Sequence, residues 1–343
     1  MADQRRVPSI YDVAQRAGVS HQTVSRVLND FEGIRPATRE KVLDAIRELG
    51  YRRSVAARTL ATSRTGSIGV LTPATAGFGP VSTLLAVEHA VRDAGYRPLV
   101  TSVVPEPDAV RAGVEFLLDH SVEALVAITP YRVMLAELEG VDLPVLTLQA
   151  GGEGPDAVAV DQLAGVGALV DHLRGLGHTA IQHVAGPAGY IEADLRRAAF
   201  ERTARERGLA PLPTLEGDWT ADAGYALAAA IAPETTAIVA GNDQMALGII
   251  HGLSDRGLRV PDDVSVTGFD DIPEAAHCLP PLTTAHQDFA EIGRLAVARL
   301  VARLDGRLDG RLDGRLDGGE ATAPAAVAPR LIVRGSTASP RRG

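Results

Sequence analysis

The sequence of 343 residues contains a single cysteine, Cys278. One cysteine cannot form a disulfide within the chain, so no disulfide framework is expected. No apolar run approaches the ~20 residues that a transmembrane helix needs. The first residues, MADQRRVPSIYDV, also lack the apolar stretch of a signal peptide. These absences predict a cytoplasmic protein that has no membrane partner.

The motifs of common catalytic and cofactor sites are also missing. A Walker A loop needs Gly-Lys, yet the only lysine, Lys41, follows Glu40. There is no G-x-S-x-G elbow, and the nine histidines show no metal-ligand spacing. The segment GVGALV from Gly165 lacks the third glycine of a dinucleotide fingerprint. The sequence therefore predicts a protein that is not an enzyme and has no cofactor and no metal site.

Charge is distributed unevenly along the chain. Residues 1–64 hold 12 basic and 7 acidic side chains, a net charge of +5, whereas the remainder carries −14 of the total of −9. This asymmetry indicates a basic segment that meets a polyanion, although an ordinary solvated helical face gives the same count. The length and the 45% of apolar residues suffice for two or three domains with sizeable cores.

The basic segment has the pattern of two short helices. Ser9 and Asp12 have the spacing of a capping box, and Gly18 suits the left-handed end of a first helix. Ser20 can cap a second helix, HQTVSRVLN, which has an apolar inner face. Two such helices joined by a tight glycine turn predict a helix-turn-helix.

The outward face of the second helix indicates contact with DNA. His21 and Gln22 lie in its first turn, where a recognition helix meets base edges. Glutamine can pair with adenine, and Arg26 can pair with guanine, whereas Thr23 is better placed for a phosphate. A small helical bundle with a polar surface is the alternative. A third helix, ATREKVLDAIRELG, follows, and its Arg39 can reach a phosphate.

The segment YRRSVAARTLATSRTG indicates a hinge. Ser54 can cap a short helix over residues 55–61, which is too short to be stable alone and should order only against a partner surface. Leu60 stands among Arg and Thr residues, and bulky apolar side chains in such arms can wedge between base pairs in the minor groove. A flexible tether is the alternative.

From Ser67 onward, apolar runs alternate with helical stretches. SIGVLT, RPLVTSVV, ALVAIT, PVLTLQ and AVAVD indicate the strands of one parallel sheet. A second array contains AIQHVAGP, TAIVAGND and VSVTGFDD, with helices such as EADLRRAAFERTARERGL between them. Two such arrays predict two doubly wound lobes, in which ligands bind beyond the carboxyl ends of the strands.

Polar residues follow several of these strands. Asn242 and Asp243 follow AIVAG, Asp270 and Asp271 follow VSVTGF, and Asp161 follows AVAV. Their amides and carboxylates can bind vicinal hydroxyls at the mouth of a crevice. An aspartate after a strand often only caps the next helix, which is the alternative for Asp243 and Asp271.

Two further residues favour a sugar or polyol as the ligand. Trp219, the only tryptophan, lies in the loop-like stretch EGDWTADAG, and an indole face suits the apolar side of a pyranose ring. Arg196 can donate two parallel hydrogen bonds to neighbouring hydroxyls. A core-filling tryptophan is the alternative.

Several motifs together resemble one family. YDVAQRAGVSHQTVSRVLN, TREKVLDAIRELGY and VAARTLAT resemble the DNA-binding head and hinge of the LacI/GalR family of bacterial repressors. GDW, AGNDQMALG, SVTGFDD and LPPLTTAHQDF resemble the second lobe of its lactose-type, galactoside-responsive members. The resemblance covers essentially the whole chain, and it implies an α + α/β fold.

The resemblance implies a helix-turn-helix head (1–53), a hinge helix and linker (54–65), and two doubly wound parallel-sheet lobes of the periplasmic-binding-protein type (66–334). The lobes would comprise 66–162 with 288–320, and 163–287 with 321–334. The four RLDG repeats at 303–318 predict an expanded surface loop, because glycine at every fourth position disfavours a long helix. Residues 335–343 are expected to form a disordered tail.

The resemblance also implies the site residues. The DNA-binding set is Ser9, Tyr11, Ser20, His21, Gln22, Thr23, Ser25, Arg26, Asn29, Thr38, Arg39, Ala57 and Leu60. The effector-binding set is Arg196, Trp219, Asn242, Asp270, Gln287, Phe289 and Gln149, with Gln287 and Phe289 in a strand that crosses back between the lobes.

The chain departs from the family pattern at four positions. Ile128 and Gln149 stand where lactose-type repressors have asparagine and aspartate, so the sugar pocket is expected to be altered on that side. His21 replaces an aromatic residue, and Arg35 stands where a Ser or Thr cap is usual.

The family pattern implies a transcriptional repressor that binds a palindromic operator and is released by a sugar inducer. No leucine heptads of the kind that assemble tetramers follow the last strand, which predicts a homodimer. The alternatives are a corepressed or activating regulator with a non-sugar effector, and a soluble sugar-binding receptor.

Overall fold

The computed structural model describes residues 8–29, 31–51, 64–148, 157–209, 212–308 and 325–341. The chain forms two compact units, a head (Met1–Thr65) and a body (Gly66–Gly343). Within the described ranges, no helix is both long and apolar enough to cross a membrane.

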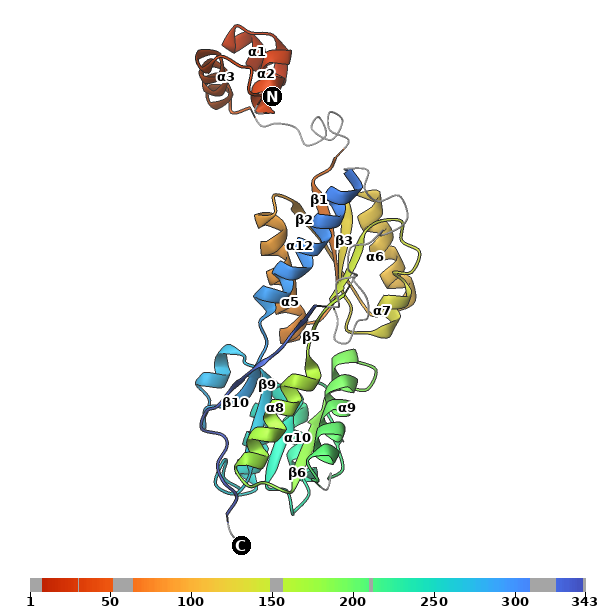
Figure 1. Cartoon of the computed structure of the whole chain (residues 1–343), viewed down its shortest axis with the longest axis vertical. Coiled ribbons are helices and arrows are strands. Elements are labelled where there is room, and N and C mark those ends of the chain that lie inside the picture. Colours follow the sequence, from red (N-terminus) through yellow and green to blue (C-terminus); the bar gives the residue numbers. More distant parts are fainter. Residues whose placement is uncertain are drawn as a thin grey trace, which may run out of the picture. The chain divides into compact units, whose positions relative to one another are not determined.

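The described part of the head contains three helices, α1 (Ile10–Ala17), α2 (His21–Leu28) and α3 (Pro36–Leu49) (Figure 1). The predicted capping box is confirmed, because the Ser9 backbone N–H donates to the Asp12 carboxylate at 2.7 Å and the Ser9 hydroxyl accepts from the Asp12 backbone N–H. Gly18 ends α1 with a φ of +67°. Ser20 accepts from the Thr23 backbone N–H at 3.2 Å and caps α2.

A small apolar core holds these helices together. Its buried members come from all three helices and are Val13, Ala14, Val24, Val27, Val42 and Ala45. Arg35 precedes α3 without a side-chain cap, and Pro36 begins that helix with a preset φ. The predicted hinge helix, residues 55–61, lies outside the described residues.

The first sheet of the body has six strands in the order β11-β5-β4-β3-β1-β2, with parallel neighbours throughout. The strands are β1 (Ser67–Pro73), β2 (Arg97–Val103), β3 (Ala124–Ile128), β4 (Val145–Leu148), β5 (Ala157–Val160) and β11 (Ala325–Val327). The five consecutive strands confirm the sequence prediction, whereas β11 was not expected in this sheet.

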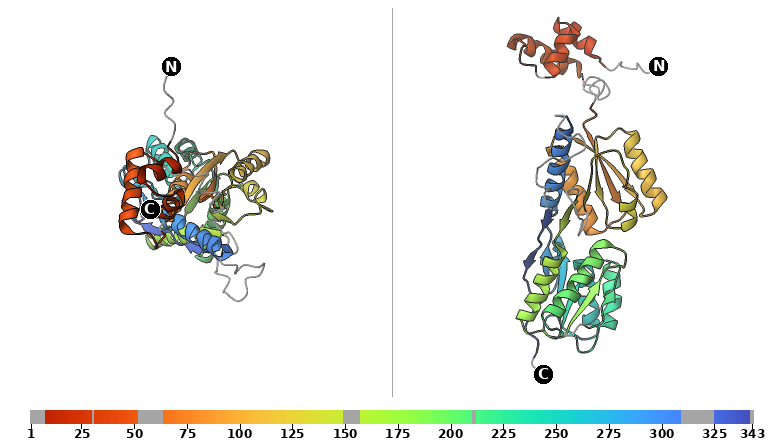
Figure 2. Two further views of the ribbon diagram at one scale, coloured as in Figure 1. Left: turned by 90° about the horizontal axis from the view of Figure 1, so that it is seen from above. Right: turned by 45° about the vertical axis from the view of Figure 1, so that its right-hand side comes forward.

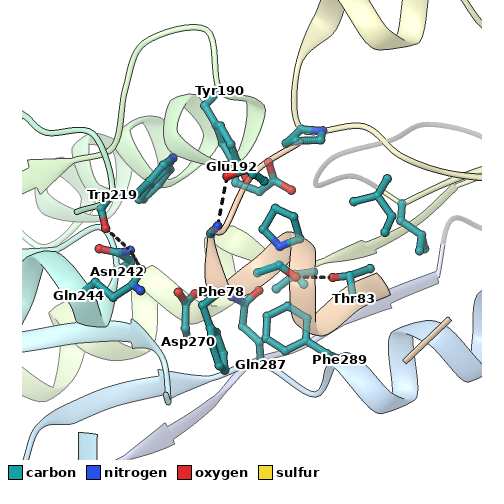
Figure 3. Close-up of a pocket in the computed structure, with 18 of the residues that line it drawn as sticks. Phe78, Thr83, Tyr190, Glu192, Trp219, Asn242, Gln244, Asp270, Gln287 and Phe289 are labelled. Carbon is teal, nitrogen blue, oxygen red and sulfur yellow. Dashed lines mark hydrogen bonds between the residues drawn. The ribbon is translucent and has the colours of Figure 1, made fainter. Parts of the chain in front are cut away.

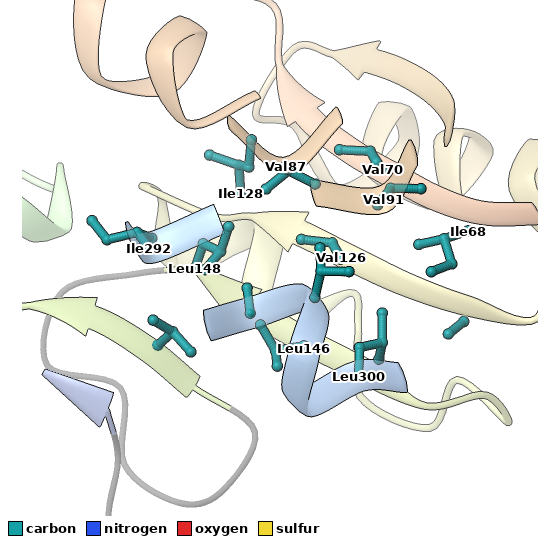
Figure 4. Packing of buried hydrophobic residues seen from close by; sticks show 14 of the residues in the cluster. Ile68, Val70, Val87, Val91, Val126, Ile128, Leu146, Leu148, Ile292 and Leu300 are labelled. Carbon is teal, nitrogen blue, oxygen red and sulfur yellow. The ribbon is translucent and has the colours of Figure 1, made fainter. Parts of the chain in front are cut away.

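Helices cover both faces of the first sheet. On one face lie α5 (Phe78–Asp93) and α12 (Phe289–Leu308), side by side in Figures 1 and 2, and on the other α6 (Pro107–Asp119) and α7 (Arg132–Ala136). Along β3 the side chains alternate: Val126 belongs to the α5/α12 core of Figure 4, whereas Leu125 belongs to the α6/α7 core. Burial on both faces explains why these strands are continuous apolar runs.

The second sheet also has six strands, in the order β12-β10-β9-β8-β6-β7, and only the β10–β12 pair among them is antiparallel. The strands are β6 (Ile181–Ala185), β7 (Leu215–Glu216), β8 (Ala237–Ala240), β9 (Ser265–Asp270), β10 (Thr283–His286) and β12 (Arg330–Ile332). Two doubly wound lobes are therefore present, as the sequence predicts.

Helices again form two layers. One face packs against α8 (Gln162–Gly175) and α9 (Ile191–Glu206); the other packs against α10 (Ala221–Leu227), η1 (Ala228–Ala230), α11 (Asp243–Asp255) and η2 (Pro273–Ala276). Helices α10 and α11 meet at Gly248, where an added Cβ would lie 1.9 Å from the carbonyl oxygen of Ala221. The close approach of these helices therefore requires glycine at this position.

The C-terminal assignments need two corrections. Residues 321–334 were assigned to the second lobe, but β11 pairs with β5 of the first sheet, and only β12 joins the second. The expected disordered tail is ordered through residue 341. The buried Ser336 hydroxyl donates to the Val266 carbonyl at 2.6 Å and accepts from the Thr283 N–H at 2.8 Å. The tail is thus held by hydrogen bonds to backbone groups near the starts of β9 and β10.

The RLDG repeat was expected to form a surface loop throughout, yet its first six residues continue α12 to Leu308. Leu304, within the repeat, is buried against the first sheet together with Leu300 one turn earlier. Burial of an apolar side chain contributes about 1.5–3 kcal/mol, which offsets the cost of about 1 kcal/mol for a helical glycine such as Gly306. Residues 309–324 lie outside the described residues.

Candidate functional site

The body contains a cavity of about 660 Å³ beyond the carboxyl ends of strands from both sheets (Figure 3). Ile128 at the end of β3, Leu148 at the end of β4 and Asp270 at the end of β9 all line it. Doubly wound sheets form ligand sites at this edge, and the size is typical of a small-molecule site.

The first lobe forms an apolar wall of this cavity. Its contributions include Phe78, Pro80, Ile128, Leu148, Val158, Phe289 and Ile292. The rings of Phe78 and Phe289, which begin α5 and α12, meet edge to face with centroids 5.8 Å apart. Phe289 was expected in a strand, but β10 ends at His286 and Phe289 starts α12. Ile128 lines the cavity. The wall is therefore apolar at the position where the sequence analysis noted an asparagine in lactose-type repressors.

The second lobe supplies a polar wall whose centre is Arg196. This buried side chain donates from Nε to the Gln162 Oε1 at 2.7 Å and from Nη1 to the Gly241 carbonyl oxygen. Its Nη2 lies 3.7 Å from the Asp270 Oδ1, and its guanidinium carbon lies 3.8 Å from the centroid of the Phe269 ring. These contacts hold the guanidinium in one orientation at the cavity.

Asp270 ends β9 with a φ of +116°, a region that residues other than glycine rarely adopt. Strained backbone of this kind persists where surrounding contacts fix it, commonly at functional sites. Its Oδ1 accepts from the Gln287 Nε2 at 2.6 Å. Burial raises the pKa of Asp270 to about 6, although Arg196 and the Gln287 hydrogen bond both lower it. The carboxyl group is therefore mostly ionised at neutral pH.

Asn242 joins α11 to the cavity. Its Oδ1 accepts from the Met245 N–H at 2.9 Å and caps α11, while its Nδ2 donates to the Trp219 carbonyl at 3.0 Å. Trp219 has a φ of +75° and stands just before α10. Gly186 makes room for the indole, because a Cβ there would lie 2.2 Å from the ring. The buried Trp219 Nε1 has no hydrogen-bond partner among the described residues.

Asp243 lies behind the cavity rather than in it. The fully buried carboxyl accepts from the Thr284 hydroxyl at 2.5 Å and from the Ile272 N–H at 2.8 Å. Gly268 leaves space for it, because a Cβ there would lie 2.0 Å from Oδ1. Burial raises the pKa of Asp243 to about 8, and the nearby Asp270 adds to the rise. Asp243 is therefore mostly protonated at neutral pH.

Two other aspartates that follow strands bind protein groups instead of facing the cavity. Asp161 accepts from the Ala164 N–H at 2.8 Å and caps α8. Asp271 accepts from the Arg334 Nη2 at 2.6 Å and lies 3.1 Å from the His286 Nδ1. Neither lines the cavity.

The structure brings six of the seven expected effector residues to this cavity: Arg196, Trp219, Asn242, Asp270, Gln287 and Phe289. The seventh, Gln149, lies outside the described residues. Their ligand-binding role stays a prediction.

Among the lining residues that the sequence did not single out are Tyr131, Tyr190 and Glu192. Tyr131, after β3, and Tyr190, after β6, form an antiparallel bridge between the lobes, and their rings meet edge to face at 5.1 Å. The Ile191 N–H donates to the Pro130 carbonyl at 2.8 Å across the same junction. The rule that residues after parallel strands face the ligand, applied to β3 and β6, would have found the tyrosines.

In the head, several of the predicted DNA-binding residues lie on or beside α2. Exposed side chains on this helix are His21, Gln22 and Arg26. The Tyr11 ring, 65% exposed, lies 5.2 Å from the His21 ring. Arg26 lies over the Phe31 ring at 5.4 Å, which holds the guanidinium beside the helix.

The remaining members of the set occupy different places. Ser9 and Ser20 cap helices, and Asn29 donates to the Ser25 hydroxyl at 3.4 Å. Thr38 and Arg39 lie in the first turn of α3, and Arg39 donates to the Phe31 carbonyl at 3.1 Å. Ala57 and Leu60 lie outside the described residues.

Comparisons with known proteins find a family match for the head and another for the body. Residues 9–54 match the model of bacterial regulatory proteins of the lacI family, and residues 170–337 match the periplasmic binding protein-like domain. The lactose operon repressor of Escherichia coli K12 is 35% identical over 301 residues, which cover 85% of this chain and 84% of that protein. The chain belongs to the LacI family.

Further relatives support the assignment along the full length. The HTH-type transcriptional regulator MalR of Streptomyces coelicolor is 32% identical over 349 residues and 96% of each chain. The crystal structure of the lac repressor dimer bound to operator and the anti-inducer ONPF has a TM-score of 0.86 at 31% identity, and covers 97% of this chain and 100% of that one. As a LacI-family member, the protein is a DNA-binding transcriptional repressor with the predicted α + α/β fold.

Proposed function

We propose that the protein acts in the cytoplasm as a homodimer that binds a near-palindromic operator and is released when a sugar enters the body cavity. The observation that carries this proposal is the constellation of Arg196, Asp270 and Asn242 beside the Trp219 indole. Galactosides are the first sugars to test, because the GDW and SVTGFDD motifs around these residues resemble those of lactose-type repressors.

The polar wall suits the hydroxyl groups of a sugar. The Asp270 carboxylate accepts hydrogen bonds and the Asn242 amide can both donate and accept, so vicinal hydroxyls can bridge them. The Trp219 ring offers an apolar face to the carbon–hydrogen side of a sugar ring. A hydroxyl-rich ligand would satisfy these groups, whereas a purely apolar ligand would leave them unpaired.

The α2 face suits DNA. His21, Gln22 and Arg26 are exposed along one helix, and two copies in a dimer would reach successive major-groove half-sites. The proposed phosphate contacts come from Thr23, Thr38 and Arg39. The net charge of +5 on residues 1–64 favours association with the polyanion.

Ligand response follows from the position of the cavity. Because the wall of one lobe is apolar and that of the other is polar, a ligand contacts both lobes and favours the lobe arrangement that fits it. If that arrangement has low operator affinity, the sugar induces, and the coupling is reciprocal. The relatives named above are transcriptional regulators, and the proposed cycle consists of binding steps alone, without catalysis.

The test is a fluorescence-anisotropy titration of the full-length protein on DNA from the region upstream of its own gene, with and without a panel of mono- and disaccharides. We expect salt-sensitive binding to that DNA and a weaker apparent affinity with at least one sugar. A sugar that strengthens binding would show corepression instead. No response to any sugar would refute the proposal.

Two variants test whether the sugar response depends on the cavity. Asp270→Asn removes the carboxylate charge and should abolish the sugar response while operator binding survives. Asp93→Asn makes the same chemical change at the exposed end of α5, away from the cavity, and should respond as the wild type does. A normal response in Asp270→Asn would remove this residue from the site.

A further inference from the structure

Basic side chains flank the stretch of chain that leads from α2 into α3 (Figure 1). The Arg26 guanidinium carbon of α2 lies 5.4 Å from the centroid of the Phe31 ring. Arg39 of α3 donates to the Phe31 carbonyl oxygen at 3.1 Å. Phe31 therefore contacts one guanidinium group from each helix, and both groups lie in the same part of the head.

Arg35 adds a third guanidinium group beside them. It is exposed and immediately precedes α3, and the Arg39 N–H donates to its carbonyl oxygen at 3.1 Å. Residues four apart in a helix lie on the same side of it, so Arg35 and Arg39 are neighbours. Arg47, in the last turn of α3, pairs with Asp44, whereas the Arg35 side chain has no hydrogen bond or ion pair among the described residues.

An arginine at this position is unfavourable for α3 itself. A Ser or Thr there would cap the helix by accepting from a backbone N–H, but Arg35 makes no side-chain cap. The first turn of α3 contains no acidic residue to offset the charge, and a cation at this end opposes the helix dipole. Residues that break a local rule in this way commonly serve a function. An anionic partner outside the chain would explain the arginine.

We propose that Arg35 binds a phosphate of the operator backbone in each head of the dimer, beside the contact proposed for Arg39. The planar guanidinium group can donate two hydrogen bonds to one phosphate. Phosphate contacts fix the position of a protein on DNA and carry no base information directly. Arg35 therefore contributes affinity and salt dependence, whereas base preference is the role proposed for Gln22. The inference rests on the proposed function, in which the α2 face meets operator DNA.

The salt dependence of DNA binding measures such a contact. The logarithm of the affinity falls with the logarithm of the salt concentration, with a slope of about −0.9 for each phosphate that the protein neutralises. A dimer that loses one contact in each head should therefore have a slope smaller in magnitude by about 1.8. At about 0.1 M salt, extrapolated from about 1 M, each lost contact weakens binding roughly eightfold.

Three variants separate the effects of the local charge, the helix cap and the net charge. Arg35→Ser removes the charge and supplies the missing cap, whereas Arg35→Lys keeps the charge and supplies no cap. Arg47→Ser removes the same charge from the last turn of α3 and is the matched control. It lies roughly 18 Å further along the helix, which exceeds the Debye length of about 8 Å at physiological salt.

The experiment is a fluorescence-anisotropy titration of the full-length wild type and the three variants at several salt concentrations. The probes are a duplex from the region upstream of the protein's own gene and a mixed-sequence duplex of the same length. We expect Arg35→Ser to weaken binding to both duplexes and to reduce the slope on the upstream duplex by about 1.8. Arg35→Lys and Arg47→Ser should keep the wild-type slope.

Hydrogen exchange of the same full-length proteins without DNA separates a lost contact from a damaged head. Arg35→Ser should slow amide exchange in α3 by roughly fivefold, because a serine side chain caps the helix. Weaker DNA binding together with a more stable α3 is a combination that a merely structural role of Arg35 would not produce.

The outcomes that would overturn the inference differ from the one that would refute the proposed function. An unchanged salt slope in Arg35→Ser would overturn it, as would weaker binding accompanied by faster exchange in α3. An equal reduction of the slope by Arg47→Ser would also overturn it, because net charge would then be the cause. A wild type that binds the upstream duplex no better than the mixed-sequence duplex would refute the proposed function, and with it an operator contact.

Discussion

The substitution Asp243→Asn removes a carboxyl group that the folded body holds protonated at neutral pH. Burial raises the pKa of Asp243 to about 8, and Asp270 adds to the rise. An unfolded aspartate has a pKa of about 3.9. Between these two values the folded chain binds one more proton at this position than the unfolded chain does.

The sign and size of the pH dependence follow from this difference. Because the folded-state pKa is the higher one, the stabilisation is complete below a pH of about 4 and is lost as the pH rises toward 8. Each pH unit in this window costs about 1.4 kcal/mol, so Asp243 alone should lower the free energy of unfolding by roughly 3 kcal/mol between pH 5 and pH 7.

Asparagine does not titrate, and it fits the hydrogen bonds that hold Asp243. Its Nδ2 can donate to the Thr284 hydroxyl, and its Oδ1 can accept from the Ile272 N–H. The variant should therefore lack this contribution to the pH slope and should be the more stable protein at pH 8.

The assay is urea unfolding of the full-length wild type and the variant at pH 5, 6, 7 and 8. The difference between the two curves cancels groups that titrate alike in both proteins. Parallel pH profiles would mean that Asp243 is ionised in the folded state, which would refute the argument from burial.

Two further predictions concern packing and base recognition. Gly248→Ala should destabilise the body by about 1–3 kcal/mol in urea unfolding, because its Cβ would overlap the Ala221 carbonyl oxygen; Gly175→Ala, where a Cβ meets nothing within 4 Å, is the control and should be neutral or slightly stabilising. Equal stability of wild type and Gly248→Ala would contradict the close approach of α10 and α11. Gln22→Ala should reduce the preference for operator over random DNA by about 1–3 kcal/mol, measured by competition binding, whereas Gln15→Ala on α1 should not. Equal losses on both DNAs would count against base recognition by Gln22.

Local signals in the sequence were sufficient for much of the fold. The Ser9 capping box and the Gly18 helix end depend on residues within one turn of each other, so their spacing predicts them directly. Strands such as β3 and β8 are buried on both faces, which produces apolar runs that sequence reasoning detects. The rule that ligands bind beyond the carboxyl ends of parallel strands predicted the location of Asn242 and Asp270 at the cavity.

Features that depend on distant partners were missed. Nothing within residues 325–327 shows that they extend the first sheet, because their partner strand, β5, lies more than 150 residues earlier in the sequence. Leu304 becomes helical through burial against that sheet, although its local sequence contains a glycine repeat. Asp243 and Asp270 both follow strands, and only the packing of Thr284 and Gly268 around Asp243 directs it inward.

Both sheets of the body are completed by strands near the C-terminus, which are synthesised last. Strand β11 closes the first sheet and β12 closes the second, so until both have left the ribosome the neighbouring edges of β5 and β10 stay unpaired. The head can fold earlier in synthesis, because the residues of its buried core lie between Val13 and Ala45. Domains generally fold in the order in which they emerge. A nascent chain would thus carry a folded DNA-binding head well before the body can complete its fold.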